Sequence, residues 1–139
     1  MNVVKQRVGI LVGLFVFALP ASGHHTFPVF YNTSQKVEVE GEVTEILWSN
    51  PHVSFFVRTS DGEVWKIESN SVNQLQRKEI TPDILRVGRV RVAGFPARNG
   101  DNGIYVSNLM LATGREEVLR PGVEPRWTPL RPESAGVAQ

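Results

Sequence analysis

The chain has 139 residues, enough for one small domain, and a formal net charge of +1. It contains no cysteine, which excludes disulfides, thiolate metal sites and cysteine nucleophiles. Without Lys5 and Arg7, which belong to the leader described next, 13 basic residues stand against 14 acidic ones, a net charge of −1. This near-neutral balance gives no electrostatic case for binding nucleic acid.

The N-terminus has the layout of a secretory signal peptide. Lys5 and Arg7 precede an apolar run over residues 8–19, and a helix breaker and small residues follow at 20–23. A membrane anchor is the alternative, but a spanning helix needs ~20 apolar residues and this run is shorter. We therefore expect residues 1–23 to be a cleaved signal peptide. The mature protein is then periplasmic or secreted and has no membrane segment.

The cleavage site decides the metal chemistry of the mature terminus. Cleavage after Gly23 leaves His24 first, and its α-amine and ring nitrogen can chelate one metal as a histidine brace. Cleavage after Ala21 leaves Ser22-Gly23-His24, which can wrap a square-planar Cu(II) or Ni(II) ion. Both termini can bind copper, although exposed terminal histidines also do so adventitiously.

Residues 24–36 predict an extended arm, and the first strand of a barrel follows. Val37, Val39 and Val43 alternate with glutamates, as in a half-buried strand that continues to Trp48. The apolar parity changes beyond Gly41, which indicates a bulge or bend. Such a long bent strand can serve two parts of a curved sheet.

The second and third strands predict a hairpin around residues 60–62. In a three-residue loop, Gly62 adopts the left-handed conformation. Val57 then lies opposite Trp65 and Phe55 opposite Ile67, so that one face of the hairpin is consistently apolar. A two-residue loop would instead oppose these apolar residues to charged ones. We therefore predict the three-residue register.

This register gives His52 candidate partners. It places His52 beside Asn70 and makes Glu68 its diagonal neighbour, and Asn50 lies two residues before it. Glu68, Asn70 and Asn50 are thus predicted to orient the ring. The alternative is a structural turn over Asn50-Pro51-His52, in which the ring caps a backbone carbonyl.

A short helix and two strands complete the predicted barrel. Ser71 and Gln74 have capping-box spacing, and Thr81-Pro82 begins a second helical turn that Gly88 ends. Residues 89–94 and 104–111 alternate as strands, and residues 97–103 form a polar loop. From residue 112 to 139 the chain is rich in proline and is predicted to be largely unstructured, with Trp127 as a possible docking point.

The resulting fold class is all-β with one short helix. The order strand, strand, strand, helix, strand, strand over residues 37–111 is that of the five-stranded oligonucleotide/oligosaccharide-binding (OB) barrel. A small split β-barrel of other topology is the alternative.

Three features together resemble an uncharacterised family of small exported bacterial proteins. They are the start His24-His25-Thr26-Phe27, the corner Trp48-Ser49-Asn50-Pro51-His52, and the segments 71–75 and 86–95. The family usually begins His-His-Ser-Phe, so Thr26 departs from it but keeps the hydroxyl. The resemblance covers about residues 24–111 and implies export and a small β fold. It also implies that both histidine motifs belong to the family's pattern.

The sequence supports two function hypotheses. In the first, His24, His25 and His52 meet at one mouth of the barrel and bind copper, in preference to zinc. In the second, the protein is a metal-independent module for a periplasmic protein or small ligand, with Trp48 and Phe56 on the contact face. No paired carboxylates or catalytic triad spacing stands out, so we do not expect an enzyme.

Overall fold

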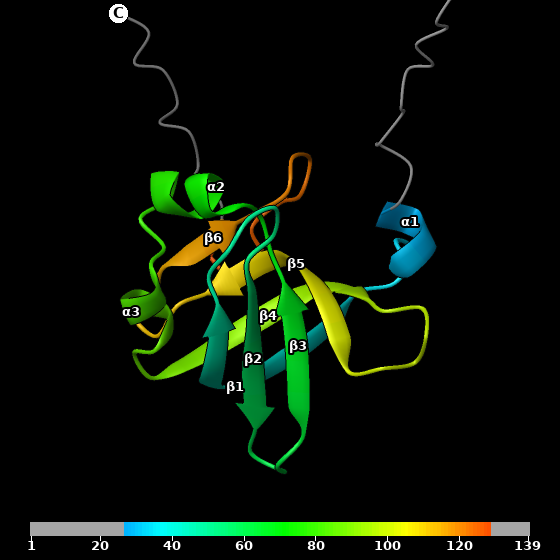
Figure 1. Ribbon diagram of the computed structural model, residues 1–139, viewed down its shortest axis with the longest axis horizontal. Helices are drawn as coiled ribbons and strands as arrows, with labels where there is room; N and C mark the ends of the chain where they lie inside the picture. Colours follow the sequence, from blue (N-terminus) through cyan, green and yellow to red (C-terminus); the bar gives the residue numbers. More distant parts are fainter. Residues whose placement is uncertain (1–26, 129–139) are drawn as a thin grey trace, which may run out of the picture.

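The computed structural model describes residues 27–128, which fold into a small β-barrel with three short helices (Figure 1). The elements in chain order are α1 (Phe27–Phe30), β1 (Val37–Leu47), β2 (Ser54–Thr59), β3 (Val64–Glu68), α2 (Val72–Arg77), α3 (Pro82–Leu85), β4 (Arg89–Pro96), β5 (Gly103–Met110) and β6 (Glu116–Val118). The predicted signal peptide, residues 1–23, lies outside the described part. Within that part, no helix is long and apolar enough to cross a membrane.

The barrel closes through one parallel strand pair. The sheet order is β3-β2-β1-β4-β5-β6, and β3 also pairs with β5, with Ile67 opposite Ile104. The first five strands therefore form the predicted closed OB-like barrel, and β6 extends the sheet beyond β5. The predicted fold class is confirmed.

Strand β1 serves two neighbours, as its sequence predicts. Residues 37–42 pair with β4 and residues 41–47 pair with β2, so Gly41 lies opposite Thr59 on one side and Val90 on the other. A Cβ atom on Gly41 would lie 2.1 Å from the carbonyl oxygen of Arg58, so only glycine fits there. The register shift itself lies between residues 43 and 45, a little beyond the glycine.

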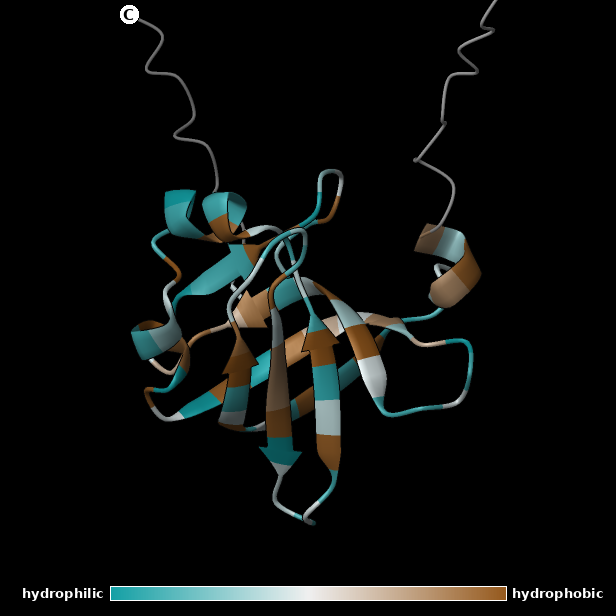
Figure 2. Ribbon diagram, in the orientation of Figure 1, coloured by the Kyte–Doolittle hydropathy of each residue, from teal (hydrophilic) through white to brown (hydrophobic). Residues whose placement is uncertain are grey.

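The hairpin register is also as predicted. Val57 lies opposite Trp65, Phe55 opposite Ile67 and Ser54 opposite Glu68, while Gly62 has φ of 92°. Phe55, Val57 and Ile67 are fully or almost fully buried, and Trp65 packs partly buried against them. Figure 2 shows hydrophobic residues along these strands and hydrophilic ones over much of α2 and α3.

The two helices between β3 and β4 begin at the predicted caps. The backbone N–H of Ser71 donates to Gln74 Oε1 at 3.2 Å, and Thr81 Oγ1 accepts from Ile84 N at 3.3 Å. Leu75 and Leu85 point into the core, so α2 and α3 cover one end of the barrel.

Both segments that flank the barrel differ from the sequence prediction. The predicted extended arm, residues 24–36, contains the helical turn α1, which Pro28 can enter because proline fits the first turn of a helix. The structure describes residues 112–128 of the predicted unstructured tail, residues 112–139, and this part is packed on the barrel. It adds β6 to β5 and buries Leu119 in the core. Tertiary contacts hold both segments on the barrel, and of these contacts the sequence anticipated the docking of Trp127.

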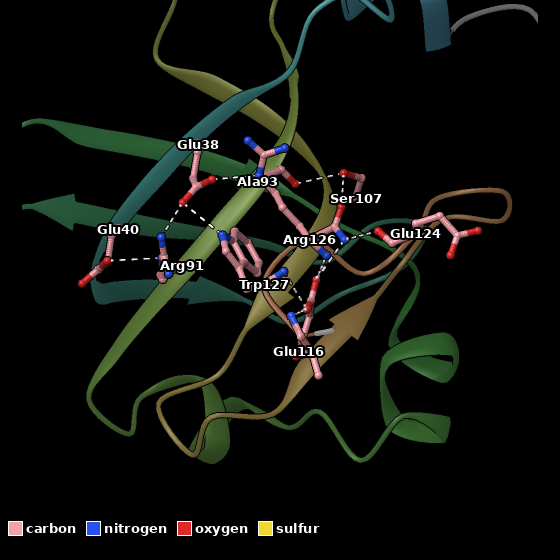
Figure 3. A network of polar contacts seen from close by, with 11 residues as sticks. Glu38, Glu40, Arg91, Ala93, Ser107, Glu116, Glu124, Arg126 and Trp127 are labelled. Atoms are coloured by element: carbon pink, nitrogen blue, oxygen red, sulfur yellow. Dashed lines mark hydrogen bonds and ion pairs between the residues drawn. The ribbon is translucent and has the colours of Figure 1, made fainter. Parts of the chain in front are cut away.

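One carboxylate holds the last described residues (Figure 3). Glu116 accepts hydrogen bonds from the backbone N–H groups of residues 126, 127 and 128 at 2.6, 3.0 and 2.7 Å, and from Asn108 Nδ2 at 3.1 Å. Burial alone would raise the pKa of Glu116, but these donors outweigh burial and lower the pKa to about 2. Trp127 docks on the barrel, where its Nε1 donates to Glu38 and its ring lies 5.2 Å from the Arg91 guanidinium.

We expect Gly41→Ala to destabilise the barrel by about 3 kcal/mol, because the added methyl group must push two paired strands apart. Urea unfolding measures the loss. Gly103→Ala is the control, since its new Cβ meets only the Ala97 side chain, at 3.1 Å. Equal losses in the two variants would contradict the close approach at Gly41.

We expect Glu116→Gln to destabilise the protein at neutral pH and to do so less in acid. The folded-state pKa of Glu116, about 2, lies below its ordinary 4.5, so its contribution is complete above pH 4.5 and is lost as the pH falls toward 2. Urea unfolding at pH 7, 4 and 2.5 measures the difference. Glu124→Gln is the control, because Glu124 is exposed and offers the network only its backbone oxygen. A constant difference across this range would contradict the assignment.

Candidate functional site

The barrel has a cleft of about 960 Å³ between α1 and β3. Its walls come from α1 and Tyr31, from β3, and from the loop between β4 and β5, with His52 at the edge. Val29 and Phe30 of α1 are 65% and 62% exposed, so one wall offers apolar surface to solvent. OB barrels bind ligands on the face of their second and third strands and in the adjoining loops, and of these parts β3 and the β4–β5 loop border the cleft here.

His52 enters the cleft because the hairpin ladder continues past the strands. Val53 N donates to Asn70 O at 3.0 Å, and Ser69 N donates to Val53 O at 2.8 Å. Since neighbouring residues of an extended chain point to opposite sides, buried Val53 leaves His52 facing outward. Its side chain is 48% exposed.

Glu68 joins His52 to Tyr31. One carboxylate oxygen lies 2.7 Å from His52 Nδ1, and the other accepts from the Tyr31 hydroxyl at 2.7 Å. Burial, and then the hydrogen bond and charge of Glu68, raise the pKa of Tyr31 well above 10, so this hydroxyl remains a donor at neutral pH. Because an ionised carboxylate can only accept, the ring must donate from Nδ1 in this contact.

The other two predicted partners of His52 bond elsewhere. Asn70 Nδ2 donates to Leu119 O at 2.8 Å, and Asn50 Oδ1 accepts from Val72 N at 3.1 Å at the start of α2. Asn70 thus anchors the C-terminal segment and Asn50 caps a helix. Of the three predicted partners, Glu68 is the one that contacts the His52 ring, as the predicted register implies.

An aromatic cluster that the sequence did not predict adjoins the cleft, and two of its rings, Phe27 and Tyr31, line it. Tyr105 packs edge-on against His52, Phe27 and Tyr31, at ring-centroid distances of 6.0, 4.7 and 5.5 Å. The guanidinium of Arg120 lies 4.2 Å from the Phe27 ring centre. Phe27, Tyr31 and Arg120 belong to segments without a repeating hydrophobic pattern. Tyr105 was predicted only as part of the fifth strand. No sequence signal therefore brings these residues together.

Trp48 and Phe56 do not line this cleft. Trp48 is half-buried and packs against the core. Phe56 is half-buried on β2, between Glu45 and Lys66 on the neighbouring strands. The apolar surface that borders the cleft comes instead from α1.

The metal-site hypothesis extends beyond the described residues. His24 and His25 lie outside residues 27–128, where His52 is the one histidine. No group of three or more histidines, cysteines or carboxylates within the described part could hold a metal ion. Any site at His52 therefore needs ligands from elsewhere in the chain or from another molecule.

Comparison with known proteins identifies the family to which the chain belongs. No curated protein matches the chain at a significant level. The model of a family of unknown function, DUF6152, matches residues 12–105, more than half of the chain. The match covers the His24-His25 start, the His52 corner, β1 to β4 and the first residues of β5. The predicted resemblance to an uncharacterised family is confirmed, and the chain belongs to the family of unknown function DUF6152.

Proposed function

We propose that the protein is an exported OB-like binding protein that holds one copper ion through His24, His25 and His52. One observation carries the proposal: the 2.7 Å contact between His52 Nδ1 and Glu68 in the cleft that α1 also lines. A histidine ligand usually has its second ring nitrogen held by a carboxylate or carbonyl, which fixes the tautomer and the ring direction. His52 has such a partner, and its side chain is half-exposed.

The length of the chain allows the terminal histidines to reach His52. The rings of Phe27 and His52 both pack on Tyr105, at 4.7 and 6.0 Å, so their centres lie within about 11 Å of each other. His25 and His24 precede Phe27 by two and three residues, and each residue of an extended chain spans ~3.5 Å. The distance is therefore compatible with a shared site.

Copper suits this donor set better than zinc. An N-terminal amine with its own imidazole and one further imidazole gives nitrogen ligands in the flat arrangement that Cu(II) favours. Zinc prefers four tetrahedral ligands, and the cleft supplies no second imidazole within residues 27–128.

We expect correctly processed protein to bind one Cu(II), and His52→Ala to weaken binding by at least about 10-fold, since even outer-shell changes cost ~10–100-fold. Competition against a chromophoric chelator measures the affinity, and intact mass identifies the terminus. A variant with an extra N-terminal Met before His24 tests the role of the His24 α-amine, and it should also bind Cu(II) more weakly. Unaltered affinity in His52→Ala would refute the shared site.

We expect Glu68→Gln to weaken Cu(II) binding by about 10-fold, because the amide holds the ring less firmly than a carboxylate. Glu42→Gln is the matched control, an exposed carboxylate on β1 away from the cleft. The same competition assay applies. Equal affinities of the two variants would remove Glu68 from the site.

The cleft also supports a second candidate function, a metal-independent interaction module. The specific observation is the exposed apolar wall of Val29 and Phe30 beside about 960 Å³ of open space. A partner bound there should be retained after chelation of metal and lost in Phe30→Asp. Pulldown from envelope extracts with both proteins separates this function from copper binding, because a partner lost on chelation argues against it.

A further inference from the structure

Two cations line the cleft beside α1 without a carboxylate partner. Lys66 belongs to β3 and Arg98 follows β4, and neither forms an ion pair with another of residues 27–128. Figure 1 shows α1 and the β4–β5 loop on the same side of the barrel. Charges in a cleft attract a counter-ion more strongly than charges on a convex surface, because the walls of the cleft focus their field.

The two carboxylates of the cleft are already engaged as acceptors. Glu68 contacts His52 Nδ1 with one oxygen and accepts from the Tyr31 hydroxyl with the other. Asp101 accepts from the side-chain amide of Asn99 in the β4–β5 loop. The cationic groups of the cleft are therefore freer to bind a ligand than its anionic groups are.

The guanidinium of Arg98 is held against α1 by one of its three nitrogens. Its Nε donates to Pro28 O at 2.7 Å, and the backbone N–H of Arg98 donates to Phe30 O at 2.9 Å. The two terminal nitrogens form no hydrogen bond with residues 27–128. A planar guanidinium presents such a pair of N–H donors in the geometry that matches a carboxylate.

Small residues leave room for a ligand beside Lys66. In the parallel pair that closes the barrel, Lys66 lies opposite Gly103, which also lines the cleft. A Cβ atom on Gly103 would lie 3.1 Å from the side chain of Ala97, a third lining residue. A glycine within a strand is often the place where a ligand approaches the backbone closely.

The same cleft offers an apolar wall. Val29 and Phe30 of α1 are largely exposed, and the rings of Phe27 and Tyr31 line the cleft beside them. Its volume of about 960 Å³ is at the upper end of the ~300–1,000 Å³ that is typical of small-molecule sites. Because apolar and cationic groups border one concave space, a ligand that contacts both must enter it.

We propose that the cleft binds a small amphipathic anion, a molecule with an apolar aromatic or aliphatic body and one anionic group such as a carboxylate. The body packs on Val29 and Phe30, and the anionic group meets Lys66 and the free end of Arg98. The inference rests on the second candidate function, for which it names the ligand class. It uses no metal and only residues within 27–128.

The first test titrates metal-free protein with anilinonaphthalene sulfonate, a fluorescent apolar anion, and with phenylnaphthylamine, its uncharged analogue. We expect Lys66→Gln to weaken binding of the anion about 5-fold, and Lys66→Arg to keep it within about 2-fold, because the contact depends on charge. Neither change should alter binding of the uncharged probe. Arg58→Gln is the matched control, an exposed and unpaired cation on β2 that does not line the cleft. Equal affinity of Lys66→Gln and the wild type for the anion would overturn the charge recognition.

The second test locates the bound anion. We expect Phe30→Ala to weaken both probes about 5-fold, because it removes apolar contact area and leaves the charges in place. Decanoate should displace anilinonaphthalene sulfonate at lower concentrations than decanol does. The amide resonances of Lys66 and Gly103 should shift on titration with decanoate, while that of Arg58 stays unchanged. Urea unfolding checks that each variant is as stable as the wild type. Shifts confined to residues outside the cleft would overturn the site.

The remaining outcomes each count against one proposal. A wild type that binds neither probe, or binds both equally well, refutes the ligand class. Binding to anionic lipid vesicles that requires Phe30 and that decanoate does not compete with also refutes it, in favour of a membrane surface. A protein partner that is lost on chelation refutes the second candidate function, while the probes still measure the cleft of the metal-free protein.

Discussion

The barrel depends on β1 pairing with two strands at once, and Gly41 and Glu42 are the residues that both pairings share. Gly41 is the point of closest approach. At that point the backbone of β1 passes so close to the carbonyl of Arg58 that no side chain fits. The β4 pairing on one side and the β2 pairing on the other let five short strands curve far enough for β3 to meet β5. Without that closure, neither the core nor the cleft exists.

Closure also assembles the candidate site. His52 precedes β2, Glu68 ends β3, and Tyr31 follows α1, so three separate segments meet at one carboxylate. Glu68 has one oxygen for each partner, and its contact with Nδ1 orients the His52 ring. The proposed copper site uses that orientation, and the alternative interaction module uses the apolar wall beside it. Both functions depend on the same placement of α1.

The segment after β5 contacts both the barrel core and α1. Glu116 holds residues 126–128 through their backbone groups, Leu119 fills the core, and Arg120 reaches across to Phe27. The C-terminal segment thus connects the sheet edge to the start of the described chain. Its prolines and charges suggest a solvated tail, but a three-residue ladder between β6 and β5 and contacts of individual side chains hold the segment on the barrel.

The sequence by itself determined the barrel strands, the hairpin register that makes Glu68 the diagonal neighbour of His52, and the helix caps, because each follows from alternation, turn chemistry or capping over a few residues. Only the tertiary structure decided that Asn70 and Asn50 bond elsewhere, that α1 is helical, and that Arg120 lies on the rings of Phe27 and Tyr105. Those contacts join residues far apart in the chain and have no period. Their geometry exists only after the barrel has closed.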